Sequence, residues 1–258
     1  MSDVARVASW LRGARAVVVI TGAGISAESG VPTFRGADGL WRSFRPEDLA
    51  TPQAFARDPE LVWDWYRWRR RSIAKAAPNP GHEVLARWDS RFPDYLLLTQ
   101  NVDGLHTRAG SRRLVEVHGN IWRARCTKNA SHVLDETEKG VGSLFAEQYP
   151  EKTPDPFFAL PTCSSCGAML RPDVVWFGEA LDGRAVDRAL AAIHACDVLL
   201  LVGTSGVVYP VAGFPSIAKR QGARVVEINL EPTPLSEVAD LVLRGPSGTV
   251  LPAIEAVL

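Results

Sequence analysis

The feature that most constrains the fold of this chain is the alternation of short, wholly apolar segments with longer amphipathic ones. The apolar segments are rich in valine, isoleucine and leucine, a composition typical of strands buried on both faces of a parallel sheet. Such strands are predicted at 16–20, 95–98, 198–202 and 224–228, and helices at 187–195 and 211–221. This order predicts an α/β fold with a doubly wound parallel sheet.

Three of the predicted strands run directly into small or polar turn residues. These turns are Thr21-Gly-Ala-Gly24, Thr99-Gln-Asn101 and Gly203-Thr-Ser205. In an open parallel sheet, ligands bind outside the carboxyl ends of the strands. The sequence therefore predicts a ligand site where these turns meet.

Charge and cysteine content argue against several classes of protein. Lysine and arginine together number 29, as do aspartate and glutamate, so the formal net charge is zero. Binders of nucleic acid or anionic membranes usually carry a basic excess, so we expect neither partner. Residues 1–16 have the pattern of an amphipathic helix rather than a signal peptide, and no apolar run reaches membrane-spanning length. The four cysteines then indicate thiols in a reducing compartment, and we expect a cytoplasmic protein, with a monomer favoured.

Two segments interrupt the alternation and divide the sheet domain. Residues 46–77 are rich in tryptophan and arginine and are expected to form helices that cap the sheet. Residues 121–170 are polar and contain three of the four cysteines, which is typical of a small inserted domain. The sheet domain is then built from three parts of the chain, 1–45, 78–120 and 171–258.

The first turn is rich in glycine. Gly22 and Gly24 allow a tight turn and a close backbone approach to a pyrophosphate, although a glycine turn without a ligand is also an ordinary structure. The next glycine is Gly30, whereas the dinucleotide fingerprint of dehydrogenases has one three residues on. This pattern favours a nucleotide site that is not used for ordinary hydride transfer.

Polar side chains follow the second predicted strand, and a histidine follows a further apolar segment. Gln100, Asn101 and Asp103 place two amides and a carboxylate where a ligand would lie, although loop caps also explain one or two of them. His118 follows the alternating segment 114–117, and a lone histidine at a strand end is usually structural. Beside the other two motifs, a general base with a pKa near neutrality is the better interpretation.

Together these segments resemble the sirtuins, a family of NAD-dependent protein deacylases. Further motifs match the family in order at 171–179, 203–205, 229–231 and 245–248, so the resemblance runs from about Val17 to the C-terminus. It implies a Rossmann-type large domain, a small zinc-binding domain, and an acyl-lysine protein or peptide held in the cleft between them. NAD would be a consumed co-substrate.

The resemblance also implies which residues bind NAD. The residues that would wrap the phosphates and cover the nicotinamide ribose are Gly22, Ala23, Gly24, Ser26, Glu28, Phe34, Arg35 and Trp41. Those that would hold this ribose and the nicotinamide are Gln100, Asn101, Val102 and Asp103. Those near the pyrophosphate and adenosine would be Gly203, Thr204, Ser205, Asn229, Leu230, Glu231 and Ser247.

For catalysis, the resemblance implies that His118 is the general base, with Asn101 and Asp103 beside it. The acyl oxygen of the substrate would attack the ribose carbon that nicotinamide leaves. His118 would then take a proton from a ribose hydroxyl, which attacks the resulting imidate. Water would finish the reaction and give free lysine, nicotinamide and an O-acyl-ADP-ribose. An extended peptide would pair with the strand that contains Val174, Val175 and Phe177.

A predicted helix that includes residues 61–71 is expected to select the acyl group of the substrate. Tyr66 and Arg69 are three residues apart and so share one side of that helix, although an amphipathic helix whose arginines face water has the same composition. The Tyr-x-x-Arg pattern resembles that of sirtuins that prefer succinyl- and malonyl-lysine, and an arginine with a phenol suits a carboxylate. We therefore expect desuccinylase and demalonylase activity beside deacetylase activity. Stacking on nucleic acid is a lesser alternative, given the zero net charge.

Three cysteines indicate a metal. Cys163-x-x-Cys166 is half of a tetrahedral zinc site, and Cys126 is expected to be a third ligand. Asn129 stands where a second Cys-x-x-Cys would end, so the fourth ligand is left open between Asn129, His132 and water, as is a degenerate site without metal. Cys196, at the head of an apolar strand, is expected to be a core thiol.

Two other functions stay open at this point. NAD-dependent mono-ADP-ribosyl transfer would use the same cleavage of NAD, with a protein nucleophile in place of water. A catalytically silent module that senses NAD or binds partners through zinc is disfavoured, because His118, Asn101 and Asp103 are all present.

Overall fold

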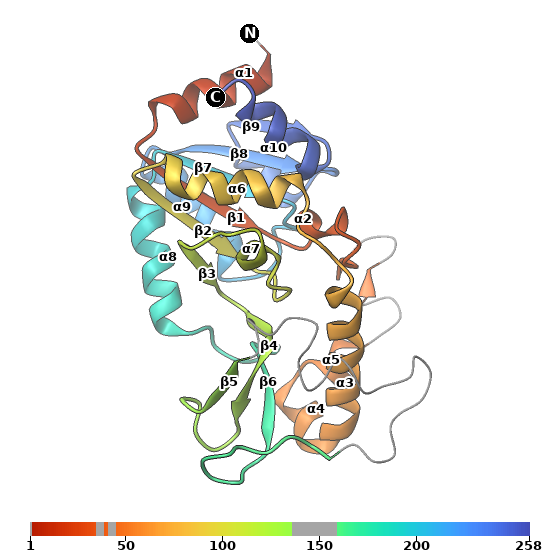
Figure 1. Ribbon diagram of the computed structural model, residues 1–258. Helices are drawn as coiled ribbons and strands as arrows, with labels where there is room; N and C mark the ends of the chain where they lie inside the picture. The colour runs from red at the N-terminus through yellow and green to blue at the C-terminus, as the bar shows by residue number, and fades with distance from the viewer. Residues whose placement is uncertain (1, 35–38, 41–44, 136–158) are drawn as a thin grey trace.

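The computed structural model describes residues 2–34, 39–40, 45–135 and 159–258, and it shows two sheets of different kinds (Figure 1). The larger sheet is parallel throughout, in the order β3-β2-β1-β7-β8-β9. Its strands are β1 (Ala16–Thr21), β2 (Asp94–Thr99), β3 (Leu114–Glu116), β7 (Val198–Val202), β8 (Arg224–Asn229) and β9 (Leu241–Arg244). The strands predicted from apolar runs are thus confirmed to within about one residue at each end.

Helices cover both faces of the larger sheet, which confirms the doubly wound α/β fold (Figure 1). One face carries α1 (Asp3–Gly13), α6 (Pro80–Arg91) and α10 (Ser247–Glu255), and the other carries α8 (Gly183–Ala195) and α9 (Phe214–Arg220). Along β1, Val17 and Val19 point into the first layer, and Val18 and Ile20 point into the second. Because successive side chains of a strand alternate between faces, a sheet covered on both sides requires wholly apolar strands.

The order of the strands reverses beside β1. The chain proceeds outward from β1 through β2 and β3, and later returns to β7 on the other side of β1 before it continues to β8 and β9. A crevice opens at such a switch point, outside the carboxyl ends of the strands. Short elements occupy the turns there, namely α2 (Gly24–Ala27), α7 (Leu105–Arg108) and the 3₁₀ turn η4 (Pro234–Glu237).

Several helices differ from their predicted ranges. α1 is shorter than the predicted 1–16. α8 begins before the predicted start at 187, because Asp182 caps it by accepting a hydrogen bond from Ala185 N. The segment 211–221 is a 3₁₀ turn, η3 (Val211–Gly213), followed by α9. The sequence did not predict β9, whose short edge segment carries too little periodic pattern.

The second region is a three-stranded antiparallel sheet with helices beside it. Its strands are β4 (Gly119–Cys126), β5 (Val133–Asp135) and β6 (Leu170–Val174), so it extends beyond the expected insertion at both ends. The segment 46–77 contains α3 (Pro46–Leu49), α4 (Pro52–Arg57) and α5 (Pro59–Ala74). These helices lie beside the smaller sheet (Figure 1) and share a core with β4 and β6, separate from the two cores of the larger sheet. The helices expected as a cap pack on the smaller sheet, in a core that also includes Val31, Val102 and Leu105 from the turns beside the larger one.

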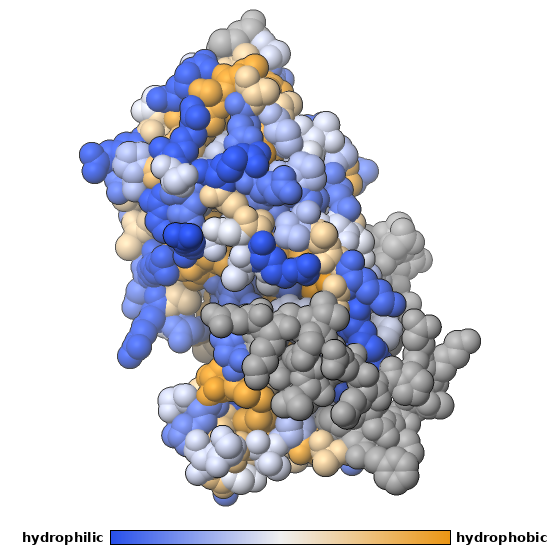
Figure 2. All heavy atoms as spheres, viewed as in Figure 1, coloured by the Kyte–Doolittle hydropathy of each residue, from blue (hydrophilic) through white to orange (hydrophobic). Residues whose placement is uncertain are grey.

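Within the residues that the structure describes, no helix combines the length and the apolarity needed to cross a bilayer. On the face shown in Figure 2, hydrophobic residues form separate patches among hydrophilic ones. Such a mixture is ordinary, since more than half of a typical protein surface is contributed by apolar atoms.

Candidate active site

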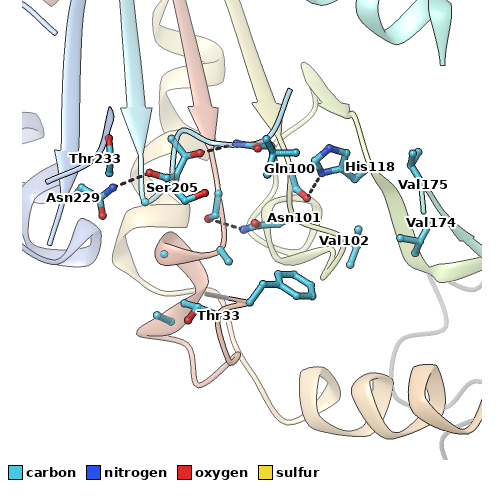
Figure 3. Close-up of a pocket in the computed structure, with 18 of the residues that line it drawn as sticks. Thr33, Gln100, Asn101, Val102, His118, Val174, Val175, Ser205, Asn229 and Thr233 are labelled. Atoms are coloured by element: carbon cyan, nitrogen blue, oxygen red, sulfur yellow. Dashed lines mark hydrogen bonds between the residues drawn. The ribbon is translucent and has the colours of Figure 1, made fainter. Parts of the chain in front are cut away.

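A cavity of about 630 Å³ lies at the carboxyl ends of β1, β2, β7 and β8, and α5 and the segment after β6 form its other side (Figure 3). The expected NAD-binding residues that line it are Gly22, Ala23, Gly24, Glu28, Phe34, Gln100, Asn101, Val102, Gly203, Thr204, Ser205, Asn229, Leu230, Glu231 and Ser247. The expected substrate and catalytic residues that line it are Tyr66, Arg69, His118, Val174, Val175 and Phe177. Arg35 and Trp41 fall outside the described residues.

The glycine-rich turn after β1 packs closely on the turn after β7. A Cβ added to Gly22 would lie 2.7 Å from the Cα of Thr204, and one added to Gly24 would lie 2.7 Å from the Cα of Gly203. Gly203 has a φ of 59°, in the left-handed region that favours glycine. Gly22 N donates to Val202 O and Gly24 N to Gly203 O. The closeness of the two turns is therefore sufficient reason for these glycines, before any ligand is considered.

Behind this turn, Ser26 and Asp103 form a buried layer that does not line the cavity. Ser26 Oγ donates to Asp103 Oδ2 at 2.8 Å, and Leu105 N donates to the other carboxylate oxygen at 2.9 Å. Asn101 lies in front of this layer, where its Nδ2 donates to Ser26 Oγ and to Gly22 O. Burial raises the pKa of Asp103. Both carboxylate oxygens of Asp103 are thus engaged inside the protein. Of the two expected catalytic residues Asn101 and Asp103, only Asn101 faces the cavity.

Two histidines in this layer were not predicted from the sequence. His82 Nδ1 accepts from Asn79 N, so Nε2 carries the proton and faces Ser26 Oγ at 3.4 Å. His106 Nε2 lies 2.9 Å from Thr21 Oγ1. Burial lowers the pKa of His82 to about 4 and that of His106 well below its usual value, so both rings are neutral near pH 7. Neither histidine belongs to a spacing pattern from which a sequence could reveal this role.

His118 lies between β3 and β4 and faces the cavity (Figure 3). Its Nδ1 is 3.0 Å from the carbonyl oxygen of Gln100. Since a carbonyl oxygen only accepts, Nδ1 carries the proton and Nε2 carries the lone pair. Burial lowers the pKa of His118, and the bond to Gln100 opposes that effect in part. The ring is therefore an uncharged base at neutral pH.

The segment after β6 runs along the cavity and is fixed by its own backbone. Val175 N donates to His118 O at 2.9 Å, and Phe177 N donates to Ala50 O at 2.9 Å. The side chain of Phe177 is 45% exposed. The N–H groups of Val175 and Phe177 are therefore engaged within the protein and are not available to an added peptide strand.

Three of the four arginines of α5 are buried, so the alternative of an amphipathic helix whose arginines face water is wrong. Arg67, Arg69 and Arg70 are 3%, 5% and 1% exposed. Arg70 donates to the carbonyl oxygens of Ile121 and Arg123 and so joins α5 to β4. Stacking of this run on nucleic acid would need guanidinium groups on the surface, and these three lie inside.

Arg69 and Tyr66 lie together at the α5 end of the cavity. The guanidinium carbon of Arg69 is 4.7, 5.0 and 6.0 Å from the ring centroids of Phe34, Trp65 and Tyr66. In the part of the chain that the structure describes, no oxygen accepts a hydrogen bond from this guanidinium, and burial lowers its pKa. The hydroxyl of Tyr66 accepts from Trp176 Nε1 at 2.9 Å. Burial raises the pKa of Tyr66, so the phenol keeps its proton and can donate it.

The small domain brings four possible metal ligands together. Cys126, His132, Cys163 and Cys166 each offer one ligand atom, and these atoms all lie within 4.8 Å of one another. Cys126 Sγ is 3.5 Å from Cys166 Sγ, and His132 Nδ1 is 3.5 Å from Cys163 Sγ. Ligands at about 2.0–2.3 Å from a tetrahedral zinc ion are roughly 3.5–3.8 Å apart, so this set fits zinc. His132, rather than Asn129, is the residue that completes the cluster.

Asn129 and the fourth cysteine, Cys196, have other partners. Asn129 Oδ1 accepts from the backbone and hydroxyl of Ser131, and its Nδ2 lies 3.2 Å from His132 Nε2. Asn129 therefore contacts the outer side of the imidazole, where a residue that orients a metal ligand would lie. Cys196 is buried and donates to Ile193 O, and burial raises its pKa to about 11, as expected of a core thiol.

The fold and the cavity define a dinucleotide-binding α/β enzyme with a second domain beside the nucleotide site. Residues 22–210 match the model of the Sir2 family, and the chain belongs to this family. It is 53% identical over 249 residues to "NAD-dependent protein deacylase 2" of Pyrobaculum aerophilum, covering 96% of this chain and 93% of that protein. A Sir2 homologue solved with NAD has a TM-score of 0.85 at 42% identity, covering 98% of this chain and 93% of that one. A Sir2 protein solved with a p53 peptide and NAD has a TM-score of 0.79 at 28% identity, covering 97% and 96% of the two chains.

Proposed function

We propose that this NAD-dependent protein deacylase acts preferentially on lysine whose acyl group ends in a carboxylate, such as succinyl- or malonyl-lysine. The observation that carries the proposal is the guanidinium of Arg69, which lines the cavity at 5% exposure without a hydrogen-bond acceptor among the described residues. A buried charge without a partner is costly. A carboxylate at the end of an acyl chain would accept two parallel N–H bonds from it, whereas an acetyl group ends in a methyl.

NAD would bind along the strand ends, on the opposite side of the cavity. The turn after β1 would approach the phosphates at Gly22 and Gly24, and Asn229 and Glu231 would lie toward the adenosine. The similar fold of a Sir2 homologue that was solved with NAD supports this placement. When bound, NAD supplies an electrophilic ribose carbon as nicotinamide leaves.

His118 would act where the two halves of the cavity meet. Its Nδ1 is held by Gln100 O, so Nε2 is the atom that can take a proton from a ribose hydroxyl. Asn101 would contact the ribose and nicotinamide, and Asp103 would hold Asn101 through Ser26. The peptide would lie beside Val174 and Val175, next to the base, because Val175 is bonded to the backbone of His118.

Zinc would be a structural ion held by Cys126, Cys163, Cys166 and His132. It would join the end of β4 to the segments that precede β5 and β6, and no step of the reaction needs it. Thiols kept for a metal suit a reducing compartment, so we place the protein in the cytoplasm.

A kinetic panel of peptides that carry acetyl, malonyl and succinyl groups on the same lysine tests the proposed specificity. We expect kcat/KM to be higher for the two acidic groups by about tenfold or more, the amount that one or two charge-assisted hydrogen bonds supply. Equal or better turnover of the acetyl peptide would refute the preference. The reaction type is tested in the same assay by its products, since deacylation gives free lysine and O-acyl-ADP-ribose. Label from NAD that stays on protein would instead indicate ADP-ribosyl transfer.

A further inference from the structure

We propose that Trp176 is a specificity-determining residue, which acts through Tyr66 by aiming the hydroxyl proton of Tyr66 into the acyl end of the cavity. The inference deepens the proposed preference for acidic acyl groups and rests on it. Trp176 and Tyr66 both line the cavity together with Arg69.

The hydrogen bond between Trp176 and Tyr66 has only one possible direction. Trp176 Nε1 lies 2.9 Å from the oxygen of Tyr66. An indole nitrogen can only donate, so the oxygen of Tyr66 is the acceptor and its own proton cannot point toward Trp176. In the described residues no other hydrogen bond to or from this hydroxyl occurs. The proton is therefore left for a ligand in the cavity.

Contacts on several sides hold the indole of Trp176 in place. The ring centroids of Trp176 and Phe55 are 5.3 Å apart. The guanidinium carbon of Arg171 lies 3.3 Å from the centroid of the Trp176 ring. Arg171 is held in turn by two hydrogen bonds to Glu179, at 2.5 and 2.9 Å. Glu179 also accepts from Trp176 N. The indole is thus held by the ring of Phe55, by the Arg171–Glu179 ion pair and by its own backbone N–H group. Its side-chain N–H group therefore stays directed at Tyr66.

The acyl end of the cavity then presents hydrogen-bond donors from two residues. Arg69 offers N–H donors without an acceptor among the described residues, and Tyr66 offers an O–H donor whose direction is restricted. Donors that converge on one point recognise a carboxylate. A donor fixed before binding loses less freedom on binding than one that must turn. Trp176 would therefore raise the affinity for an acidic acyl group through its hydrogen bond to Tyr66.

Trp176→Phe tests this, because it keeps a buried aromatic ring and removes only the N–H group and the second ring. We expect the ratio of kcat/KM for succinyl over acetyl peptide to fall about three- to tenfold, through KM rather than kcat. If the variant does not fold, the same test is made with 3-benzothienylalanine at position 176, which has the shape of indole without its N–H group. Trp63→Phe is the matched control, since the buried indole of Trp63 donates to Leu170 O and does not line the cavity. It should leave the ratio unchanged.

A double-mutant cycle decides whether Trp176 acts through Tyr66. The ratio in Trp176→Phe with Tyr66→Phe should be no lower than in Tyr66→Phe alone, because the proton that Trp176 directs is already absent. Additive losses, or an unchanged ratio in Trp176→Phe, would overturn the inference. Arg69→Met separates the two proposals: if it lowers the ratio and Trp176→Phe does not, the acidic preference stands and the role of Trp176 fails. If Arg69→Met leaves the ratio unchanged, the preference itself fails.

Discussion

The two ends of the cavity are built in opposite ways. At the strand ends, neutral polar groups are bonded to one another, as Gln100 Nε2 is to Thr204 Oγ1 and Asn229 Nδ2 to Thr204 O (Figure 3). At the α5 end, the guanidinium of Arg69 is surrounded by aromatic rings and hydrogen-bonds no described residue. These side chains at the first end have hydrogen-bond partners before a ligand arrives, whereas the guanidinium at the second end has none among the described residues.

One end of the cavity would therefore serve the chemistry that all acyl substrates share, and the other end would distinguish one acyl group from another. The strand ends and His118 would handle NAD and the ribose hydroxyl, which are the same for every acyl group. The α5 end would contact only the distal part of the acyl chain. Changes at the first end should therefore affect all acyl peptides equally, and changes at the second should affect acidic ones selectively.

The largest expected effect is that of His118→Ala. Removing the base should lower kcat about 10²–10⁴-fold on acetyl and succinyl peptides alike, while calorimetry still detects NAD binding. His194→Ala is the matched control, because His194 also bonds a backbone carbonyl through Nδ1 but lies exposed on α8. A His118→Ala variant with nearly normal turnover would contradict the assignment of the base.

The pH dependence of the unmodified protein checks the same residue. Burial lowers the pKa of His118, so the fraction of neutral base falls only when the pH drops below the usual histidine value of about 6.5. We expect kcat/KM to be level from pH 7 upward to the next titration, and to fall about tenfold per pH unit on the acidic side. An acidic limb centred above pH 7 would assign that limb to another group.

The next effect in size concerns the metal. Purified protein should hold about one zinc ion per chain, and His132→Ala and Cys163→Ser should each reduce that content severely, because both remove a donor from a closed tetrahedral site. Asn129→Ala should keep most of the zinc, since Asn129 contacts only the imidazole. Metal analysis that finds full zinc in His132→Ala would show that the fourth ligand lies elsewhere. Activity should fall for both acyl peptides together, because the ion lies off the reaction path.

Arg69→Met should separate the two ends of the cavity. We expect KM for succinyl peptide to rise about tenfold or more and acetyl peptide to be nearly unaffected, since the lost hydrogen bonds are made only to a carboxylate and are worth roughly 1.5–3 kcal/mol each. An equal rise in KM for both peptides would mean that Arg69 stabilises the cavity and does not bind the acyl group.

The control for this variant follows from the burial of α5. Arg70→Met is unsuitable, because Arg70 is buried and donates to the carbonyl oxygens of Ile121 and Arg123, so its loss should destabilise the protein. Arg71 is only half-buried and does not line the cavity. Arg71→Met makes the same substitution on the same helix, and it should change neither substrate.

The strand ends could be predicted from the sequence and much of the α5 end could not. Apolar runs and the spacing of Gly22 and Gly24 are local patterns, and the parallel topology brings the turns that follow them together. Helical spacing shows that Tyr66 and Arg69 share a side, but not what covers that side. Trp176, which contacts Tyr66, lies 110 residues further along the chain. The buried arginines and the position of Trp176 therefore depend on tertiary packing that no local pattern reports.

The ligands of the metal cluster likewise include some that the sequence predicted and one that it left open. Cys163 and Cys166 share a turn, so their spacing alone predicted that they would meet. His132 lies between β4 and β5 and reaches the two cysteines from there. It does not stand at the position where a second Cys-x-x-Cys would end, which is Asn129. The sequence therefore supplied the chemical type of the site and left the fourth donor open.

The smallest expected effect is that of Tyr66→Phe, and it needs the most careful control. Tyr66 offers one neutral donor where Arg69 offers a charged pair, so the preference for succinyl over acetyl peptide should fall by less than in Arg69→Met, by roughly several-fold. The substitution also leaves the buried N–H group of Trp176 without its acceptor, which should cost about 1–3 kcal/mol of stability. Tyr95→Phe separates the two consequences, because the hydroxyl of Tyr95 donates to Leu85 O in the core of the large domain, away from the cavity. Both variants should melt at a lower temperature, and only Tyr66→Phe should change the ratio of the two substrates. If Tyr95→Phe changed that ratio as much, the specificity would reflect global stability, and the division between the two ends of the cavity would not hold.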